Sequence, residues 1–357
     1  MKRTRVAVIF GGQSSEYEVS LMSASSVLRN LDRDRYEVIT LGINKKGRWL
    51  LYNGSIDRIK NKRWEQPGFV RDAFISPSTN SCAIIAMRED NRFTEIQIDV
   101  VFPVLHGKNG EDGTIQGLLE LAGIPYVGCD TLSSAICMDK IVAHSVLKDA
   151  GIKTADWIGV IGKDTKNPEL CDRLIRQKFG YPVFVKPANA GSSVGISKVK
   201  KPGELGAALD KALLTDGRII IEQGITGIEL ECAVLGNGEP LASDVGEIAP
   251  LAEFYDYDAK YIDGGTGLFV PARVEEKTRK KIGEIAVKAY RVMACTGLAR
   301  VDFFLQPDGA IVLNELNTLP GFTHISMYPR LFEAAGLPYK NLLDRLIELA
   351  FEKKAGA

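Results

Sequence analysis

The sequence lacks the features that would indicate a membrane protein, a nucleic-acid binder or a secreted protein. Its 45 basic and 45 acidic residues balance, so bulk charge favours neither nucleic acid nor a membrane as partner. No apolar run approaches the roughly 20 residues that span a bilayer. The apolar stretch 6–10 is also shorter than a signal-peptide core of roughly 7–15 residues. We therefore expect a cytoplasmic protein.

Several catalytic and cofactor motifs are also missing. The six cysteines include no C-x-x-C pair, which in a chain of this length is typical of reduced, mostly buried thiols. No Walker loop occurs. The G-x-G-x-x-G fingerprint is also absent, so a nicotinamide cofactor has no support. No Ser-His-Asp or reactive-cysteine pattern stands out. The cysteines are Cys82, Cys129, Cys137, Cys171, Cys232 and Cys295.

The N-terminal third alternates short apolar strands with helical patterns. Strands are expected at 5–10, 36–43 and 98–105, and helices at 19–31 and 113–122. This alternation predicts a parallel, doubly wound sheet, whose ligands bind beyond the carboxyl ends of its strands. Gly11-Gly12 and His106-Gly107 both fall at such ends.

A helix at 131–150 is followed by a change to an α+β pattern. Antiparallel strands are expected at 182–187, 194–199, 218–223 and 229–235, with a helix at 204–214. Residues 252–272 form a connection rich in Tyr, Asp and Gly, and connections of that length are typically functional or disordered. A helix at 274–293, a hairpin at 298–317 and a helix at 341–353 complete the chain. At roughly 100–200 residues per domain, two or three domains are expected.

The hairpin carries the strongest chemical signal. Asp308-Gly309 between apolar runs predicts a two-residue turn, in which residues whose numbers sum to 617 face each other. Asp302 then faces Glu315, and Arg300 faces Asn317, all on one side.

Opposed carboxylates destabilise a sheet unless a cation lies between them, and Mg²⁺ prefers such oxygen ligands. A solvated face with an Arg–carboxylate pair is the alternative. The other side is expected to be apolar, with Asn314 as the exception. It would carry Val301, Phe303, Leu305, Val312 and Leu316.

A strand, a Gly/Ser loop and a second strand follow one another at 183–199. Ser192 and Ser193, with Gly191 and Gly195, can present N–H groups and hydroxyls to an anion. Lys186 stands in an otherwise apolar strand, where an unpaired lysine would be costly, and could provide a point charge for phosphate. A flexible hairpin is the alternative.

Two glutamates flank the turn at 224–227. Glu222 and Glu229 could accept hydrogen bonds from a ribose or an adenine amino group, or could be solvated strand ends. On the helix 131–150, an exposed position is the default expectation for Lys140, and packing or surface for His144.

Glu16 and His106 each allow two interpretations. Glu16 follows Gly11-Gly12, where glycine permits a tight turn and close approach of a ligand. It is either a favourable acid in the first turn of a helix or a ligand for a substrate ammonium. His106 is either structural or a ligand contact.

Taken in order, these pieces resemble the D-alanine–D-alanine ligase family of the ATP-grasp superfamily over nearly the whole chain. The motifs that carry the resemblance are Gly11-Gly-Gln-Ser-Ser-Glu-Tyr-Glu-Val-Ser20, His106-Gly107 with Gly110-Glu-Asp-Gly-Thr114, Met138-Asp-Lys140, Lys186-Pro with Gly191-Ser-Ser-Val-Gly195, Phe254-Tyr-Asp-Tyr-Asp-Ala-Lys-Tyr261, Arg300-Val-Asp302, Asn314-Glu-Leu-Asn317 and Pro320-Gly-Phe-Thr323 through Ser326-Met-Tyr-Pro329. The segment Thr323–Ser326 departs from several members, so His324 and Ile325 receive no role.

The resemblance implies an ATP-grasp fold that combines α/β and α+β parts. A Rossmann-like substrate domain would cover 1–130, a central ATP-grasp subdomain 131–221, and a C-terminal ATP-grasp and metal-binding domain 222–357. The implied reaction joins two D-alanines for peptidoglycan synthesis through a D-alanyl phosphate, with ATP as substrate and two Mg²⁺ ions for which Mn²⁺ can substitute. A homodimer is implied, without nucleic acid or membrane.

The resemblance also implies a role for each site residue. ATP would contact Lys140, Lys186, Ser193, Glu222 and Glu229, and the metal ions Asp302, Glu315 and Asn317. The first D-alanine would meet Glu16 and His106, with Ser192 and Tyr261 completing a network with Glu16. The second would place its carboxylate at Lys260, Ser326 and the Met327 backbone. Arg300 and the Gly321 N–H would stabilise the tetrahedral oxyanion, and the 252–272 loop would be the lid.

Three rival functions remain. A vancomycin-resistance-type ligase would join D-alanine to D-serine or D-lactate, and the segment 128–139 resembles the D-serine type, whereas Tyr261 favours D-alanine. A non-catalytic nucleotide-binding protein is disfavoured because Asp302, Glu315 and Asn317 are all present. A Rossmann oxidoreductase is disfavoured by its missing fingerprint.

Overall fold

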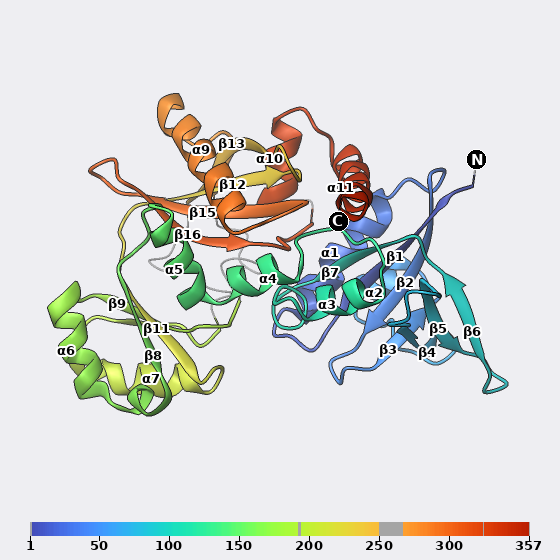
Figure 1. Cartoon of the computed structure of the whole chain (residues 1–357), viewed down its shortest axis with the longest axis horizontal. Helices are drawn as coiled ribbons and strands as arrows, with labels where there is room; N and C mark the ends of the chain where they lie inside the picture. Colours follow the sequence, from blue (N-terminus) through green and yellow to red (C-terminus); the bar gives the residue numbers. More distant parts are fainter. Residues whose placement is uncertain (1, 192–193, 250–266, 324, 357) are drawn as a thin grey trace.

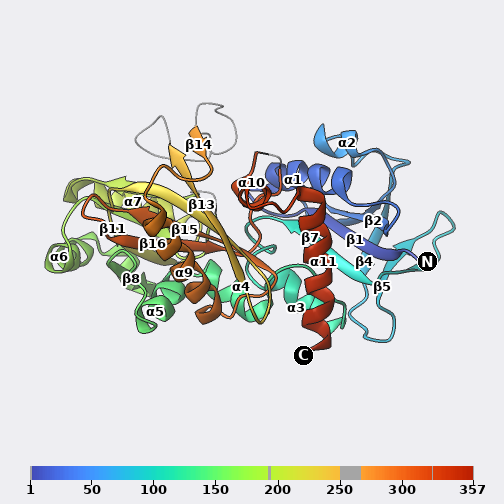
Figure 2. The same cartoon turned by 90° about the horizontal axis from the view of Figure 1, so that it is seen from above.

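The computed structural model describes residues 2–191, 194–249, 267–323 and 325–356. These residues form a seven-stranded sheet in the order β6-β5-β4-β3-β2-β1-β7, a four-stranded sheet β10-β9-β11-β8 and a five-stranded sheet β14-β13-β12-β15-β16. Figure 1 shows the N-terminal sheet on one side and the other two on the opposite side, and Figure 2 gives the view from above. Among the described helices, none is long and apolar enough to span a membrane.

The N-terminal sheet is parallel only in part. β1 (Thr4–Gly11) pairs in parallel with β2 (Tyr36–Ile43) and with β7 (Val100–Leu105), as predicted. Four strands that were not predicted extend the sheet beyond β2 by antiparallel pairing, so the predicted parallel pairing is confirmed for β2, β1 and β7 while the sheet as a whole is mixed. They are β3 (Trp49–Tyr52), β4 (Val70–Ile75), β5 (Ala83–Met87) and β6 (Phe93–Gln97).

Both faces of this sheet are covered, because successive side chains of a strand point to opposite sides. Val8 and Phe10 of β1 pack in one core with α1 (Tyr17–Asn30) and α11 (Tyr339–Ala355), and α2 (Ile56–Lys60) adds Ile59 to it. Ile9 packs on the other side with α3 (Thr114–Leu121). β1 ends at Gly11 and β7 at Leu105, and each of these strand ends is followed by a loop.

The helix predicted at 131–150 is two helices. α4 (Thr131–Met138) ends at Asp139, whose backbone is extended, with φ −82° and ψ 102°. The Asp139 carboxylate accepts a hydrogen bond from the Val142 N–H at 3.1 Å and so caps α5 (Lys140–Asp149). The break makes Lys140 the first residue of α5, where it is 9% exposed, so the expectation of an exposed lysine is wrong.

The four-stranded sheet is antiparallel and presents one face to helices. It contains β8 (Trp157–Ile161), β9 (Val183–Pro187), β10 (Ser197–Val199) and β11 (Arg218–Gln223), flanked by α6 (Pro168–Lys178), α7 (Leu205–Leu213) and the 3₁₀ turns Gly162–Lys166 and Pro202–Glu204. Val185 and Ile221 share a core with α6 and α7. Alternation sends Lys186 and Glu222 to the opposite face. β8 and α6 were not predicted, and β11 runs past residue 221, where the central subdomain was expected to end; the domain limits remain a prediction.

The five-stranded sheet lies between two helices. Its strands are β12 (Ile228–Leu235), β13 (Leu241–Ala249), β14 (Gly267–Phe269), β15 (Leu298–Leu305) and β16 (Ile311–Asn317), all antiparallel. α9 (Glu276–Val292) packs with Val301 and Phe303. α10 (Met327–Ala334) packs with Ala233 in the core that also holds α1 and α11, which joins this sheet to the N-terminal one. β14 lies within the expected loop 252–272, of which 252–266 fall outside the described residues.

The cysteine prediction is confirmed. All six thiols are free, and all except Cys82 are buried.

Candidate functional site

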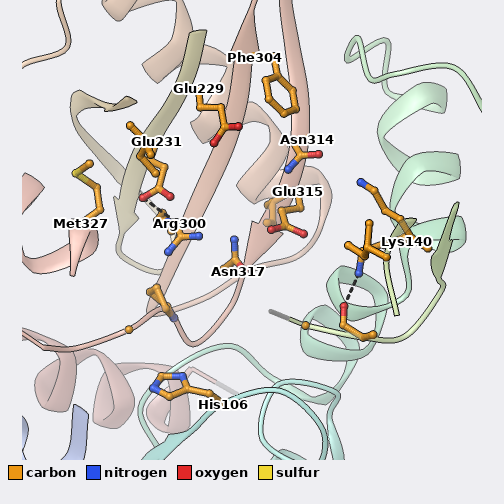
Figure 3. Close-up of a pocket in the computed structure, with 18 of the residues that line it drawn as sticks. His106, Lys140, Glu229, Glu231, Arg300, Phe304, Asn314, Glu315, Asn317 and Met327 are labelled. Atoms are coloured by element: carbon orange, nitrogen blue, oxygen red, sulfur yellow. Dashed lines mark hydrogen bonds and ion pairs between the residues drawn. The ribbon is translucent and has the colours of Figure 1, made fainter. Parts of the chain in front are cut away.

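A cavity of about 1540 Å³ lies where the three sheets approach one another. Most of the predicted site residues line it, namely Glu16, His106, Lys140, Lys186, Glu222, Glu229, Arg300, Glu315, Asn317, Gly321, Ser326 and Met327. Figure 3 shows how several of them converge from different elements. Ser192, Ser193, Lys260, Tyr261 and His324 lie outside the described residues, so their predicted places remain predictions.

The hairpin has the predicted pairing at its functional end but not near its turn. Asp302 faces Glu315 and Arg300 faces Asn317, as expected. Closer to the turn, Leu305 faces Ile311, because the loop between the strands has three residues, 307–309, rather than two. A bulge beyond Asp302 restores the expected register.

The bulge changes which side chains face the cavity. Val312 pairs with Phe304, and both line the cavity together with Asn314. The expectation that Val312 and Asn314 lie on the opposite face is therefore wrong. The core face carries Val301, Phe303, Leu305, Ile311, Leu313 and Leu316.

Arg300 lies at the centre of a buried acidic cluster. Its Nε and Nη2 donate to the two carboxylate oxygens of Asp302, both at 2.7 Å, and Nε lies 3.1 Å from Glu231 Oε2. Asn317 Nδ2 also donates to Asp302 at 3.0 Å. Burial opposes the charge of the guanidinium, but the carboxylates of Asp302 and Glu231 outweigh it and hold the pKa of Arg300 well above its ordinary value.

Asp302 itself is not among the residues that line the cavity. The Arg–carboxylate pair anticipated as the alternative is present, and its two side chains are 17% and 13% exposed, so the pair is mostly shielded from solvent.

Glu231 was missed by the sequence analysis. It stands on β12 directly beside Asp302, so that Glu231, Asp302 and Glu315 lie abreast on three neighbouring strands. Its side chain is only 8% exposed, and Figure 3 shows it between Met327 and Arg300. The available signal was a charged residue that alternates with apolar ones in the strand 229–235.

A second buried group lies on the four-stranded sheet. Lys186 Nζ is 2.6 Å from Glu222 Oε2, and His144 Nε2 is 3.3 Å from Glu222 Oε1. Burial alone would raise the pKa of Glu222, but Lys186 and His144 outweigh it and hold that pKa far below its ordinary value. His144 is 3% exposed and lines the cavity, so the expected packing or surface role is incomplete.

Lys140 reaches the same space from the start of α5. Its Nζ donates to the Ala190 carbonyl at 2.6 Å, at the entrance to the Gly/Ser loop. Burial lowers the pKa of Lys140, and the nearby Lys186 lowers it further, against the opposite effect of Glu315. Two lysines thus stand close together, an arrangement that favours a polyanionic ligand.

The loops that follow β1 and β7 of the N-terminal sheet contribute a histidine and two glutamates. His106 contacts the Leu319 carbonyl through Nδ1 at 2.9 Å and Ser23 Oγ through Nε2 at 3.0 Å. Burial lowers its pKa to about 4, so the imidazole is neutral at physiological pH. Both ring nitrogens have protein partners, as the structural interpretation predicts, and the contact of His106 with substrate stays a prediction.

Glu16 and Glu111 lie near each other beside this histidine. Glu16 is 6% exposed, and a Cβ on Gly191 would overlap its Oε1, so any side chain at residue 191 would displace this carboxylate. Glu111 accepts a hydrogen bond from the Gly107 N–H at 3.1 Å. Burial, and then the charge of Glu16, raises the pKa of Glu111 well above its ordinary value. Glu111 lies within the motif Gly110–Thr114, but no role was predicted for it.

The segment that closes the cavity precedes α10. Ser326 Oγ lies 3.0 Å from the Thr323 N–H and 2.8 Å from Thr323 Oγ1, and a Cβ on Gly321 would lie 2.8 Å from the same oxygen. Met327 begins α10 over Gly246. Ile325 lines the cavity with 53% of its surface exposed.

Comparison with known proteins matches both halves of the chain. The family described as D-ala D-ala ligase N-terminus matches residues 5–129, and D-ala D-ala ligase C-terminus matches residues 146–348. A D-alanine–D-alanine ligase of Caldicellulosiruptor bescii is 51% identical over 99% of this chain and 96% of its own length. D-alanine–D-alanine ligase A of Escherichia coli is 45% identical over 99% of this chain and 98% of its own.

Two solved structures are also similar. The VanG D-Ala:D-Ser ligase of Enterococcus faecalis has a TM-score of 0.88 and 43% identity, covering 98% of this chain and 100% of its own. The D-alanine–D-alanine ligase of Coxiella burnetii has a TM-score of 0.86 and 36% identity, covering 100% of this chain and 96% of its own.

Proposed function

The chain belongs to the D-alanine–D-alanine ligase family, and from that premise we propose that it joins two molecules of D-alanine into D-alanyl-D-alanine at the expense of ATP. It is an enzyme of the ATP-grasp type that uses ATP and a divalent metal ion. The observation that carries the proposal is one cavity lined by Lys140 and Lys186 together with Arg300 and Glu315, which Glu16 reaches from the loop after β1.

The proposed reaction has two steps. A carboxylate oxygen of the first D-alanine attacks the γ-phosphorus of ATP, which forms D-alanyl phosphate and releases ADP. The free amine of the second D-alanine then attacks the acyl carbon, and the tetrahedral intermediate expels phosphate. Catalysis rests on positioning and on neutralising charge, so no covalent protein nucleophile is required.

In this proposal, the lysines and the glutamates of the cavity contact different parts of ATP. Lys140 and Lys186 contact phosphates, with Ser193 from the Gly/Ser loop, and Glu222 and Glu229 contact the adenosine. Support comes from the lysine positions in the cavity, where burial makes an anionic partner favourable. Lys186 then has to exchange Glu222 for a phosphate oxygen.

The metal ligands proposed are Asp302, Glu315 and Asn317, holding two Mg²⁺ ions for which Mn²⁺ can substitute. The donor set fits a hard cation, because Asp302 and Glu315 face each other and Asn317 adds an amide oxygen. Within the described residues no group of three His, Cys, Asp or Glu forms a metal site. Bound Mg²⁺ would neutralise the charge of the phosphate groups.

The amino-acid subsites are proposed from the family resemblance. Glu16 accepts the first ammonium beside neutral His106, in a network with Ser192 and Tyr261. The second carboxylate meets Lys260, Ser326 and the Met327 backbone. Arg300 and the Gly321 N–H stabilise the oxyanion, and the 252–272 segment closes as a lid that protects the acyl phosphate from water.

A D-alanine–D-serine ligase is the second candidate, because the VanG ligase structure is similar at 43% identity. Phosphate release by the enzyme with ATP and Mg²⁺ separates the two when D-alanine alone is compared with D-alanine plus D-serine or D-lactate. We expect the highest kcat/KM with D-alanine as second substrate. A higher kcat/KM for D-serine would overturn this assignment, and no D-alanine-dependent phosphate release would overturn the ligase.

The setting of the reaction is also part of the proposal. The dipeptide would serve peptidoglycan synthesis in the cytoplasm, where ATP is present, and the enzyme would be a homodimer. Light scattering of the purified protein tests the last point, with a mass of twice 39.0 kDa expected.

A further inference from the structure

One buried histidine has no task in the reaction described above. His144 projects from α5 into the cavity beside Lys186 and Glu222. Its Nε2 lies 3.3 Å from Glu222 Oε1, whereas its Nδ1 has no hydrogen-bond partner within the described part of the chain. The contact between the imidazole and the carboxylate is thus the only polar contact that fixes this ring among those residues.

Packing holds the ring in place against that carboxylate. The centroids of the His144 and Trp157 rings are 6.0 Å apart, with an angle of 57° between the planes. Trp157 on β8 is the direct register partner of Glu222 on β11. His144 is therefore held between the tryptophan and the glutamate of one strand pair, and its position is coupled to that of the Glu222 side chain.

Glu222 divides its two oxygens between two partners. Oε2 lies 2.6 Å from Lys186 Nζ, and Oε1 faces His144. If Lys186 turns to an ATP phosphate, Oε2 becomes available, while Oε1 stays with His144. A carboxylate held at one oxygen offers a single acceptor in a fixed direction, and a buried acceptor favours a ligand that donates to it over one that cannot.

We propose that His144 is a positioning residue for base recognition, which orients Glu222 so that the cavity accepts a 6-aminopurine nucleotide and rejects a 6-oxopurine nucleotide. This inference rests on the proposed function, in which Glu222 contacts the adenosine. The amino group of adenine would donate to Oε2. The 6-oxo group of hypoxanthine would instead bring lone pairs against the carboxylate.

The test compares binding of ATP and inosine triphosphate, each with Mg²⁺ and without D-alanine, by isothermal titration calorimetry. The wild-type enzyme is expected to prefer ATP by at least about tenfold, the scale of one hydrogen bond to a charged group. In H144F the Kd for ATP should rise about tenfold while the Kd for inosine triphosphate changes less than about threefold. H144Q keeps an N–H donor and should retain most of the preference.

Two controls separate positioning from structure. Lys148 is exposed one turn further along α5, and K148Q should leave both Kd values unchanged. If H144F does not melt cooperatively, H144M, which fills the site without a donor, should show the same loss of preference.

Equal weakening of both nucleotides in the donor-free variant, or a collapse of the preference in H144Q, would overturn the inference. Equal binding of the two nucleotides by the wild-type enzyme would overturn it as well. Because D-alanine is absent, these outcomes are independent of whether the dipeptide is formed.

Discussion

Arg300 donates to both carboxylate oxygens of Asp302, each at 2.7 Å, from two residues earlier on the same face of β15. Asp302 is also a proposed metal ligand, so the residue that would hold the cation is engaged by the residue that would stabilise the oxyanion. If Asp302 holds the cation, metal binding would have to draw it away from Arg300. Arg300 then keeps Glu231, whose Oε2 is 3.1 Å from Nε.

Removing either charge from this centre should stop the reaction without unfolding the protein. R300A and E315A are each expected to lower kcat at least about a hundredfold, because both residues act on charge that develops in the reaction. The measurement is phosphate release, with thermal melting as the fold control. Near-wild-type rates in either variant would show that the site map is wrong.

Glu231 should act through Arg300. E231Q removes one charge from the cluster and leaves the side-chain size unchanged, so the guanidinium loses one of its two carboxylate partners. We expect kcat to fall about tenfold, the scale of a lost charged hydrogen bond, with KM for ATP little changed. E231D should recover part of the rate. A change confined to KM for ATP, with kcat intact, would place Glu231 elsewhere in the mechanism.

The contact between Gly191 and Glu16 gives a steric prediction. In G191A the new methyl group would displace the Glu16 carboxylate, so KM for the first D-alanine should rise about tenfold or more, the scale of a lost charged contact. G203A is the matched control, because a Cβ there meets no atom within 4 Å. Equal kinetics of the two variants would argue against Glu16 as the ammonium ligand.

Much of the fold could be predicted because local patterns determine it. The hairpin shows the limit of this reasoning. Asp308-Gly309 correctly marked a turn, yet the turn has one residue more than expected, and the bulge near Asn314 compensates for it. Asp302 therefore faces Glu315 as predicted, although Val312 and Asn314 do not lie on the predicted face.

Other features depend on contacts between distant parts of the chain. The pairing of His144 with Glu222 joins α5 to β11, and no local pattern reveals it. Glu231 becomes notable only because β12 lies beside β15. The short strands β3 to β6 were missed since each is stabilised mainly by its neighbours in the sheet.

His106 should make stability sensitive to acid. Its pKa is about 4 in the folded protein, lowered from 6.5 by burial. Between these values the unfolded chain binds a proton that the folded chain excludes, so stability is retained above pH 6.5 and is lost as pH falls toward 4. The loss attributable to this residue is about 3 kcal/mol.

The variant H106N removes that titration. The free energy of unfolding of H106N, measured with urea, should be lower than that of the wild type at about pH 7. At about pH 4.5 this difference between the two proteins should be smaller by about 2 kcal/mol, because only the wild type loses stability through His106. A deficit that does not change with pH would show that His106 is not excluded from protonation by the fold.

The most direct measurement follows one oxygen atom through the reaction. D-alanine labelled with ¹⁸O in its carboxylate is incubated with the enzyme, ATP and Mg²⁺, and the dipeptide and the released phosphate are analysed by mass spectrometry. An acyl phosphate requires that each D-alanyl-D-alanine formed be accompanied by one phosphate that carries one ¹⁸O atom. Dipeptide accompanied by unlabelled phosphate, or labelled D-alanine that yields no dipeptide, would contradict the account.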